Sequence, residues 1–408
     1  MKPLFCLAAS LLGFAVAVPA FADDQKPEEG FVPMFNGKDL SGWVNVNCAP
    51  STFFVKNNEI ITTGKPTGYL RTEKQYENFI AEFDWMHVPP KPDAVGNSGF
   101  FVWADPLPAV GTGYSRGIEV QVLVNLEYKN KKGDITATSH GDLFSIWGAK
   151  CVPDRAHPDG WERCLPSENR AKGAGEWNHY RVEAKDGRIT LAVNGKVVSG
   201  VSKCSPRKGY LALESEGSEC RFRNLKIKEL PSTNPKPEEC AEVAQGHVNL
   251  FTGLDLSGWE PREQWMPRDG VLHAGREGRA LYTKKEYGDA EFIVDFRFPP
   301  KGKECILVFR QALRASSITL TVRREGWIKA TAEGDDFANR TFKGLKPAGE
   351  WNRLLATVQD KLLKVSINGK WAIELDSTTL APKGTFGVYS DGEMDFRSLF
   401  VRELGKKE

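Results

Sequence analysis

The segment IEVQVLVN (residues 118–125) places two polar side chains with catalytic potential on one face of an extended strand. Successive side chains of a strand point to opposite faces, so Glu119 and Gln121 share one face while Ile118 and Val120 share the other. A carboxylate beside an amide can transfer a proton, bind a sugar hydroxyl or ligate a divalent metal ion. The alternative is a polar face that meets only solvent.

The segments SHGDLF and LESEGSECRF add titratable groups that could complete such a site. His140 and Asp142 lie two residues apart in the first, and a histidine beside a carboxylate can move a proton or bind a divalent metal. An ordinary loop histidine is the alternative for His140. In the second segment Glu214 is a candidate for substrate binding, with a surface role as the alternative, whereas Glu216 precedes a glycine and is interpreted as part of a turn. Other candidates for binding a polar substrate lie in the same half of the chain: Asn97, Arg116 and Gln121.

The chain contains an internal repeat. FNGKDLSGW (residues 35–43) returns as FTGLDLSGW (residues 251–259), GEWNHYRVEAKDGRITLAVNGK returns as GEWNRLLATVQDKLLKVSINGK, and FRNLKIKEL returns as FRSLFVREL. The repeated unit is therefore a whole domain, predicted over 31–230 and again over 247–405. The proline-containing polar stretch 231–246 is typical of a linker.

Both repeats show the period of β-strands. FIAEFDW, NHYRVEA and RITLAVN alternate apolar with polar residues, and both copies of NGK are typical of hairpin turns. Matching FIAEFDW to FIVDFRF aligns Phe83 with Phe296. No segment of comparable length keeps a period of 3.6 residues. The sequence predicts an all-β protein made of two tandem β-sandwich domains.

The second copy is shorter where the first is most polar. The offset between matched residues falls from 216 at Trp43 and Trp259 to 174 at Asn194 and Asn368, and most of this shortening lies between Trp85 and Gly175. The strand SITLTV of the second copy takes the place of IEVQVL and lacks its glutamate and glutamine. A copy that keeps the scaffold motifs and loses the polar insert predicts a functional site in the first domain only.

The composition and the N-terminal residues limit the classes to which the protein can belong. A basic start, the apolar run LFCLAASLLGFAVAV and an A-x-A end predict a signal peptide over 1–22, hence a periplasmic or secreted protein. Export favours disulfides, and we predict one between Cys151 and Cys164, which bracket a loop with two prolines. The 55 basic and 53 acidic residues nearly cancel, which gives no case for a nucleic-acid or anionic-membrane partner. No further apolar span, G-x-S-x-G, H-E-x-x-H or phosphate loop is present.

Five motifs in order connect the chain to a known family: FNGKDLSGW, NSGFF, IEVQVLV, GEWNHYRVEAKDGRITLAVNGK and FRNLKIKEL. With them the chain resembles the 3-keto-disaccharide hydrolase domain, in two tandem copies of which the second is degenerate. The resemblance implies a concanavalin-like jelly roll for each domain. It also implies an exported enzyme that cleaves glycosides already oxidised at C3 by a separate sugar C3-dehydrogenase.

The chemistry that the resemblance implies is elimination followed by hydration. A C3 ketone acidifies the C2 hydrogen, so a base can remove it, the C1 substituent leaves, and water adds to the resulting 2-hydroxy-3-keto-glucal. Glu119, His140 and Asp142 are the expected catalytic residues, and His140 with Glu119 could hold a divalent metal on the ketone oxygens. No nucleotide cofactor is expected. Sugar binding is assigned to Asn97, Arg116, Gln121 and Glu214. The alternative is a non-catalytic carbohydrate-binding protein of laminin-G or concanavalin-like fold.

Overall fold

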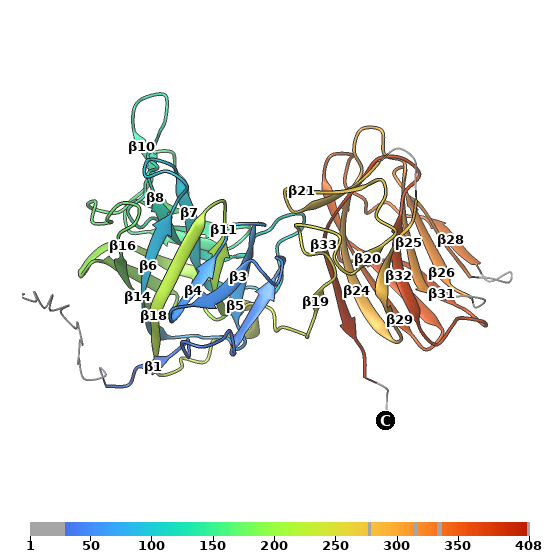
Figure 1. The fold of residues 1–408 in the computed structure, drawn as a ribbon, viewed down its shortest axis with the longest axis horizontal. Helices are drawn as coiled ribbons and strands as arrows, with labels where there is room; N and C mark the ends of the chain where they lie inside the picture. Colours follow the sequence, from blue (N-terminus) through green and yellow to red (C-terminus); the bar gives the residue numbers. More distant parts are fainter. Residues whose placement is uncertain (1–28, 276–278, 313–315, 333–336, 406–408) are drawn as a thin grey trace, which may run out of the picture.

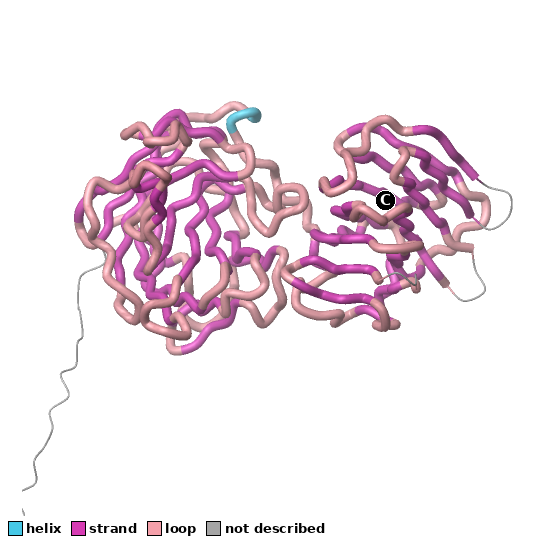
Figure 2. Tube along the Cα trace, turned by 90° about the horizontal axis from the view of Figure 1, so that it is seen from above, coloured by secondary structure: helices cyan, strands magenta, loops and turns pink. Residues whose placement is uncertain are grey.

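The computed structural model shows the two repeats as two β-rich domains arranged end to end (Figure 1). Strands and loops make up almost all of the described chain, and its one helix is the short 3-10 helix η1 (Pro237–Glu239; Figure 2). The predicted all-β class is therefore confirmed. Within the described residues no helix has the length and hydrophobicity of a membrane span. The predicted signal peptide lies outside the described residues, which are 29–275, 279–312, 316–332 and 337–405.

The first domain is a sandwich of two antiparallel sheets that enclose one hydrophobic core. Its nine-stranded sheet runs in the order β12 (Lys150–Pro153), β16 (Lys196–Ser205), β15 (Arg188–Val193), β14 (Asn178–Lys185), β6 (Phe79–Val88), β18 (Glu219–Glu229), β4 (Glu59–Thr62), β3 (Phe53–Lys56), with β1 (Val32–Pro33) beside β18. Its seven-stranded sheet runs β13 (Arg163–Cys164), β11 (Leu143–Ile146), β8 (Gly117–Val124), β7 (Gly96–Ala104), β17 (Tyr210–Ser215), β5 (Gly68–Thr72), β2 (Trp43–Val46). A separate hairpin joins β9 (Tyr128–Lys129) to β10 (Ile135–Ala137).

The second domain repeats this sandwich around its own core. In its described residues the eight-stranded sheet runs β21 (Trp265–Arg268), β22 (Val271–Ala274), β33 (Met394–Glu403), β24 (Ala290–Arg297), β29 (Trp351–Gln359), β30 (Leu362–Ile367), β31 (Lys370–Asp376), with β19 (Val248–Asn249) beside β33. The opposite sheet runs β20 (Trp259–Glu260), β23 (Leu281–Tyr287), β32 (Gly384–Tyr389), β25 (Glu304–Gln311), β26 (Ile318–Arg323), β27 (Trp327–Ala332), β28 (Phe337–Thr341).

Strand pairing corrects the sequence alignment of the repeats by two residues. Asn178 and Phe222 both pair with Trp85 in the first domain, and the matching Asn352 and Phe396 both pair with Phe296 in the second. Phe296 therefore corresponds to Trp85, not to Phe83. A shift of two keeps every side chain on the same face of the strand, so the alternating pattern could not reveal the error.

A pair of asparagines explains why both copies keep GEWN and NGK. Asn178 is buried at the start of β14, and its Oδ1 accepts hydrogen bonds from the backbone N of Lys172 at 2.7 Å and from Nδ2 of the turn residue Asn194 at 3.0 Å. Asn352 accepts the same bond from Asn368 at 2.8 Å in the second domain. The two motifs therefore tie a strand start to the neighbouring hairpin turn in each domain.

The domains pack face to face. Tyr69, Phe101 and Tyr210 on the seven-stranded sheet of the first domain share a buried hydrophobic cluster with Ile293 and Phe400 on the eight-stranded sheet of the second. These residues lie on the sheet faces that point away from the two domain cores. The second domain thus covers part of the outer face of the seven-stranded sheet.

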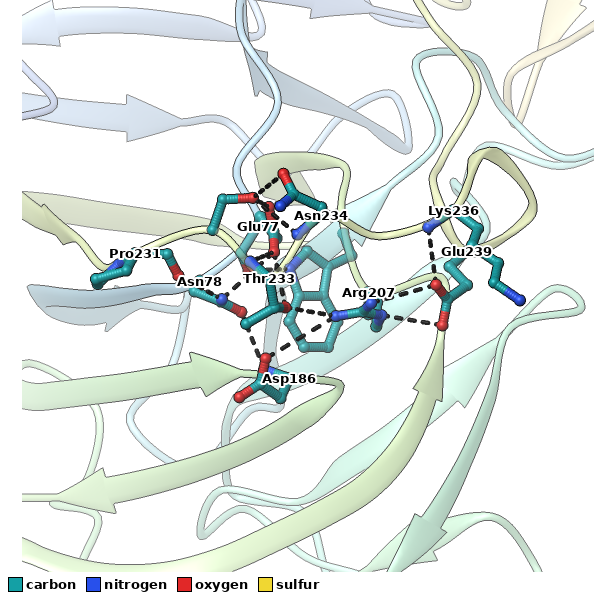
Figure 3. Close-up of polar contacts among 11 residues, drawn as sticks. Glu77, Asn78, Asp186, Arg207, Pro231, Thr233, Asn234, Lys236 and Glu239 are labelled. Atoms are coloured by element: carbon teal, nitrogen blue, oxygen red, sulfur yellow. Dashed lines mark hydrogen bonds and ion pairs between the residues drawn. The ribbon is translucent and has the colours of Figure 1, made fainter.

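The predicted linker 231–246 is attached to the first domain by polar contacts (Figure 3). Oε1 of Glu77 accepts a hydrogen bond from the backbone N of Thr233 at 2.7 Å. Further along, Nε of Arg207 donates to Oε1 of Glu239 at 3.0 Å. These contacts restrict the linker and hence the relative placement of the two domains.

The predicted Cys151–Cys164 disulfide is absent from the structure, where every cysteine of the described residues is a free thiol. Each of the two thiols lies near a backbone carbonyl, Cys151 at 3.5 Å from Glu162 O and Cys164 at 3.5 Å from Leu165 O. The segment between them is not a free loop, because β12 pairs with β16 and β13 pairs with β11. Backbone pairing therefore holds each end of the segment, Cys151 in the nine-stranded sheet and Cys164 in the seven-stranded sheet.

Replacing either buried asparagine should destabilise its own domain. Asn178→Ala and Asn352→Ala each remove a buried amide that accepts two hydrogen bonds, so each should lower the free energy of unfolding by about 2 kcal/mol. Urea unfolding followed by Trp fluorescence measures the change. The exposed Glu374→Ala should stay within about 0.5 kcal/mol of wild type. Unchanged unfolding midpoints in both asparagine variants would refute the role assigned to the shared motifs.

Candidate functional site

The site begins with β8, whose two faces are divided as predicted. Ile118 and Val120 belong to the core, while Glu119 pairs with Phe101 on β7 and with Phe144 on β11. Phe101 lies in the interdomain cluster, so Glu119 sits on the outer face beside the part that the second domain covers. Glu119 and Gln121 are both buried, at 6% exposure, and do not form an open polar surface.

A glycine lets two carboxyl groups approach each other on this face. A Cβ atom added to Gly99 on β7 would lie 2.8 Å from Oε1 of Glu119 and 3.0 Å from Oε2 of Glu214. Both side chains therefore occupy the space that a larger residue would fill. Glu214 is 1% exposed, and neither of its carboxyl oxygens has a hydrogen-bond partner in the structure. A buried carboxyl group without partners is costly to ionise.

Glu216 is the third member of what we term the carboxyl cluster, Glu119, Glu214 and Glu216. The Oη of Tyr114 donates to Oε1 of Glu216 at 2.6 Å, and Nδ2 of Asn97 donates to Oε2 at 2.5 Å. Nε2 of Gln121 donates in turn to Oδ1 of Asn97 at 2.9 Å. The turn interpretation of Glu216 is therefore incomplete, since its carboxylate is held by two donors from other parts of the chain.

The three carboxyl groups titrate differently because their surroundings differ. Burial, followed by the charge of Glu216, raises the pKa of Glu119 to about 8. Burial and the charges of Glu119 and Glu216 raise the pKa of Glu214 well above its usual range. Burial also raises the pKa of Glu216, but the hydrogen bond from Tyr114 opposes the rise. Glu216 has the hydrogen bonds that stabilise an ionised form, and Glu214 has none.

Asp142 is fully buried and binds Arg163, a residue that the sequence does not identify as a site candidate. Nε of Arg163 donates to Oδ2 of Asp142 at 2.7 Å, and Thr138 donates to the same carboxylate through its backbone N and its hydroxyl. The guanidinium also lies 4.1 Å from the ring centre of Phe144 and contacts Oε1 of Gln121 at 3.4 Å. Arg163 thus presents a fixed cation beside the carboxyl cluster.

His140 and Arg116 lie outside this network. His140 contacts the hydroxyl of Ser139 at 3.1 Å and lines a separate surface pocket with Asn125 and Lys172, and burial lowers its pKa. The guanidinium of Arg116 forms a two-pronged ion pair with Asp105, at 2.7 and 2.9 Å. The structure therefore brings together Glu119, Gln121, Asn97, Asp142 and Glu214 of the predicted site residues, but not His140 or Arg116.

The expected metal pair of His140 and Glu119 stays a prediction. Across the described residues no group of three or more His, Cys, Asp or Glu side chains is arranged to hold a metal ion. The charged groups that act on Glu119 are Glu216, Arg163 and Asp142, whereas those that act on His140 are Asp142 and Glu127.

An exposed tryptophan stands beside the carboxyl cluster. The ring of Trp147 stacks on that of Tyr114, with centroids 6.0 Å apart and planes inclined by 12°. Trp147 is 52% exposed and has a positive φ of 51°, which is unusual for a bulky side chain. The free face of an indole is a suitable surface for a sugar ring. Trp147 lies outside the segments that alternate with a strand period, so the sequence alone does not predict where its side chain points.

In the second domain two of the three matching positions carry no carboxyl group, and the third, which matches Glu216, carries Asp391. Strand pairing places Thr319 where the first domain has Glu119, Ile306 where it has Gly99, and Tyr389 where it has Glu214. An isoleucine fills the space that Gly99 leaves open. The site is therefore confined to the first domain, as the internal comparison of the repeats predicts.

The sequence profile of the 3-keto-alpha-glucoside-1,2-lyase-like domain matches residues 30–228 and 246–402, and the chain belongs to this family in both halves. The resemblance inferred from the five motifs is thereby confirmed, including its two tandem copies. Family membership supports a carbohydrate-active function. No curated protein matches the chain in sequence.

Solved structures of similar shape share little sequence with the chain. A provisionally assigned glycosyl hydrolase from Parabacteroides distasonis ATCC 8503 is 23% identical, over 50% of this chain and 95% of its own, with a TM-score of 0.38. The carbohydrate-binding module CBM66 from Bacillus subtilis is 13% identical, over 36% and 96%, with a TM-score of 0.32. The β-glucanase of Bacillus licheniformis is 9% identical, over 39% and 99%, with a TM-score of 0.32. The function of the chain is therefore inferred from its site and from its family.

Replacing Glu119 with glutamine should flatten the dependence of stability on pH. The pKa of Glu119 is 4.5 in the unfolded chain and about 8 in the folded protein. At a pH between these two values, Glu119 keeps its proton in the folded state and has released it in the unfolded state. The contribution of this group to stability is thus complete below about pH 4.5 and is lost as the pH rises through about 8. The side chain in Glu119→Gln cannot ionise. The unfolding free energy of this variant should therefore increase relative to that of the wild type as the pH rises from about 5 to about 9. Parallel curves in urea unfolding would show that Glu119 titrates normally.

Proposed function

We propose that the first domain cleaves 3-keto-glycosides by elimination across C1 and C2, followed by hydration. The observation that carries this proposal is the carboxyl cluster, in which groups of one chemical type are held in unlike environments. Titratable groups whose pKa values are pushed apart within one site are the usual acid and base of an enzyme. We also propose that the protein is exported and that a sugar C3-dehydrogenase supplies its substrate.

Glu216 is the proposed base. Its carboxylate accepts hydrogen bonds from Tyr114 and Asn97, which favour its ionised form relative to the two neighbouring carboxyl groups. Glu119 is the proposed acid, because a pKa of about 8 keeps it protonated at neutral pH. Glu214, whose pKa is raised well above its usual range by burial and by the neighbouring charges, stays neutral beside them.

The steps balance without a cofactor. Glu216 takes the C2 proton, which the C3 ketone has made acidic, and the electron pair left on C2 forms the C1–C2 double bond as the C1–O bond breaks. Glu119 gives its proton to the departing oxygen. Glu216, now protonated, and Glu119, now ionised, exchange roles when water adds its hydroxyl at C1 and a proton at C2 of the glucal.

Arg163 is the proposed partner of the enolate oxygen at C3. Its guanidinium is fixed by Asp142 and faces Gln121, so it needs no rearrangement to stabilise negative charge that develops there. Asn97, which already donates to Glu216, and Gln121 are proposed to bind neighbouring hydroxyl groups. In this scheme Asp142 acts as a positioning residue and not as a base.

A binding protein without catalysis would not need this arrangement. Burying three carboxyl groups on one sheet face opposes folding, and the second domain shows that the same scaffold forms with threonine and tyrosine in place of Glu119 and Glu214. Incubation with a 3-keto-glycoside separates the two possibilities. Release of the aglycone with a transient glucal supports elimination, release without a glucal supports direct hydrolysis, and binding without release supports the carbohydrate-binding alternative.

Removing either proposed proton-transfer group should abolish most turnover while leaving the fold intact. Glu216→Gln and Glu119→Gln should each lower kcat on a 3-keto-glycoside by about 10²–10⁴-fold, the usual contribution of a general acid or base. Asp391→Asn, at the position in the second domain that matches Glu216, is the control and should keep wild-type kcat. Wild-type turnover in both glutamine variants would move the chemistry elsewhere.

Trp147 should matter only for substrates whose leaving group is a ring. Stacking of a sugar on the indole is worth about 1 kcal/mol, so Trp147→Ala should raise KM about fivefold for a 3-keto-disaccharide. The KM of a methyl 3-keto-glucoside should not change. Trp161→Ala removes a tryptophan of similar exposure that stacks on His157 and is the matched control. Equal effects on both substrates would indicate a structural role.

A further inference from the structure

The second domain contacts a loop of the first that leads directly into the carboxyl cluster. Oδ2 of Asp295 accepts a hydrogen bond from the backbone N of Gly111 at 2.9 Å, and Nη2 of Arg353 donates to the carbonyl of Pro108 at 2.8 Å. Asp295 is fully buried and pairs with Arg353 at 2.7 and 2.8 Å. A buried ion pair of the second domain thus binds the backbone of the first.

Gly111 is required for this contact by both space and backbone conformation. Its φ is +73°, and a Cβ atom would lie 2.1 Å from Cγ of Trp351 in the second domain. The loop backbone therefore lies directly against the Trp351 ring. Any side chain at this position must push the loop away from the second domain.

The loop is internally bonded between Pro108 and Tyr114. The hydroxyl of Thr112 donates to the carbonyl of Ala109 at 3.0 Å and accepts from the backbone N of Tyr114 at 3.1 Å, while Ala109 N donates to Tyr114 O at 2.8 Å. A displacement at Gly111 therefore reaches Tyr114, whose hydroxyl holds Glu216.

The surface of the second domain differs from its counterpart where it meets the first. In the first domain this sheet face carries Glu82, with ion pairs to Arg181 and Lys226. The corresponding residues of the second domain are Ile293, Leu355 and Phe400, and all three belong to the interdomain cluster. A charged face has become an apolar face at the positions that dock.

We propose that the second domain, which lacks the carboxyl cluster, is a positioning part of the site: through Asp295, Arg353 and Trp351 it holds the loop that sets Tyr114 against Glu216. The inference rests on the proposed function for its catalytic readout, but the placement of Tyr114 can be tested without turnover. It explains what a duplicated domain without a site contributes to the protein.

Gly111→Ala in the full chain is the direct test. It should lower kcat at least tenfold and move the limb of the pH–rate profile that reports ionised Glu216 to higher pH, because a displaced Tyr114 no longer stabilises that carboxylate. Tyr114→Phe should produce the same shift, and the double variant should add nothing, since both changes remove one hydrogen bond. Gly369→Ala, at the same φ of +73° but with nothing within 4 Å of its Cβ, controls for backbone strain and should leave kcat and the profile unchanged.

A second variant tests docking from the other side. Leu355→Arg gives the second domain the residue that the first carries at the matching position, Arg181, so the sandwich itself tolerates it. It should speed amide hydrogen exchange in residues 106–116 and shift the pH profile as Gly111→Ala does. Wild-type kcat and pH profile in both variants, or an equal loss in Gly369→Ala, would overturn the proposal.

Titration of the Glu216 carboxyl group separates this inference from the proposed activity. In protein labelled with 13C-glutamate, with Glu216→Gln for assignment, Gly111→Ala should raise the midpoint of the Glu216 signal. The groups that face Glu216 are Glu119 on β8, Glu214 on β17 and Tyr114 of the loop, with Arg397 on β33 next to Tyr114. A raised midpoint in a protein that cleaves no 3-keto-glycoside supports positioning and refutes the activity, whereas an unchanged midpoint refutes positioning.

Discussion

The desolvation of three neighbouring carboxyl groups is the constraint on which the site depends. Glu119, Glu214 and Glu216 share a sheet face from which water is largely excluded, so they cannot all be ionised at once. The protein meets this constraint unequally: Tyr114 and Asn97 donate to Glu216, whereas Glu214 meets the carboxyl group of Glu216, a contact that raises the pKa of Glu214. Unequal hydrogen bonding therefore gives three chemically identical side chains different surroundings.

The duplication shows which residues belong to the scaffold and which to the site. The indole nitrogens of Trp43 and Trp259 each donate to a backbone carbonyl nine residues earlier, so the shared LSGW motif anchors the entry of each domain. Strand pairing then allows the outer faces to differ while the cores stay alike. Because the two faces of a strand vary independently, one copy could keep the carboxyl cluster and the other could become a docking surface.

Sequence reasoning found what a single strand encodes and missed what distant strands bring together. The two-residue period placed Glu119 and Gln121 on one face, and the loss of both in the second repeat located the site. Tyr114 and Arg163 come from a loop and a two-residue strand, where no period predicts direction. His140 was favoured for its chemistry, yet its loop carries it to a different pocket. The metal pair that residue type suggests, His140 with Glu119, stays a prediction.

The interface between the domains connects the scaffold to the chemistry. It buries Tyr69, Phe101 and Tyr210, which lie on the same sheet as Glu119 and Glu214 and would otherwise meet solvent. The outer face of this sheet therefore has an apolar part, which the second domain covers, and the buried carboxyl cluster beside it. A linker bound to the first domain keeps the covering domain close, so docking costs little entropy. For these reasons the two domains are better regarded as one functional unit than as an enzyme with an appended module.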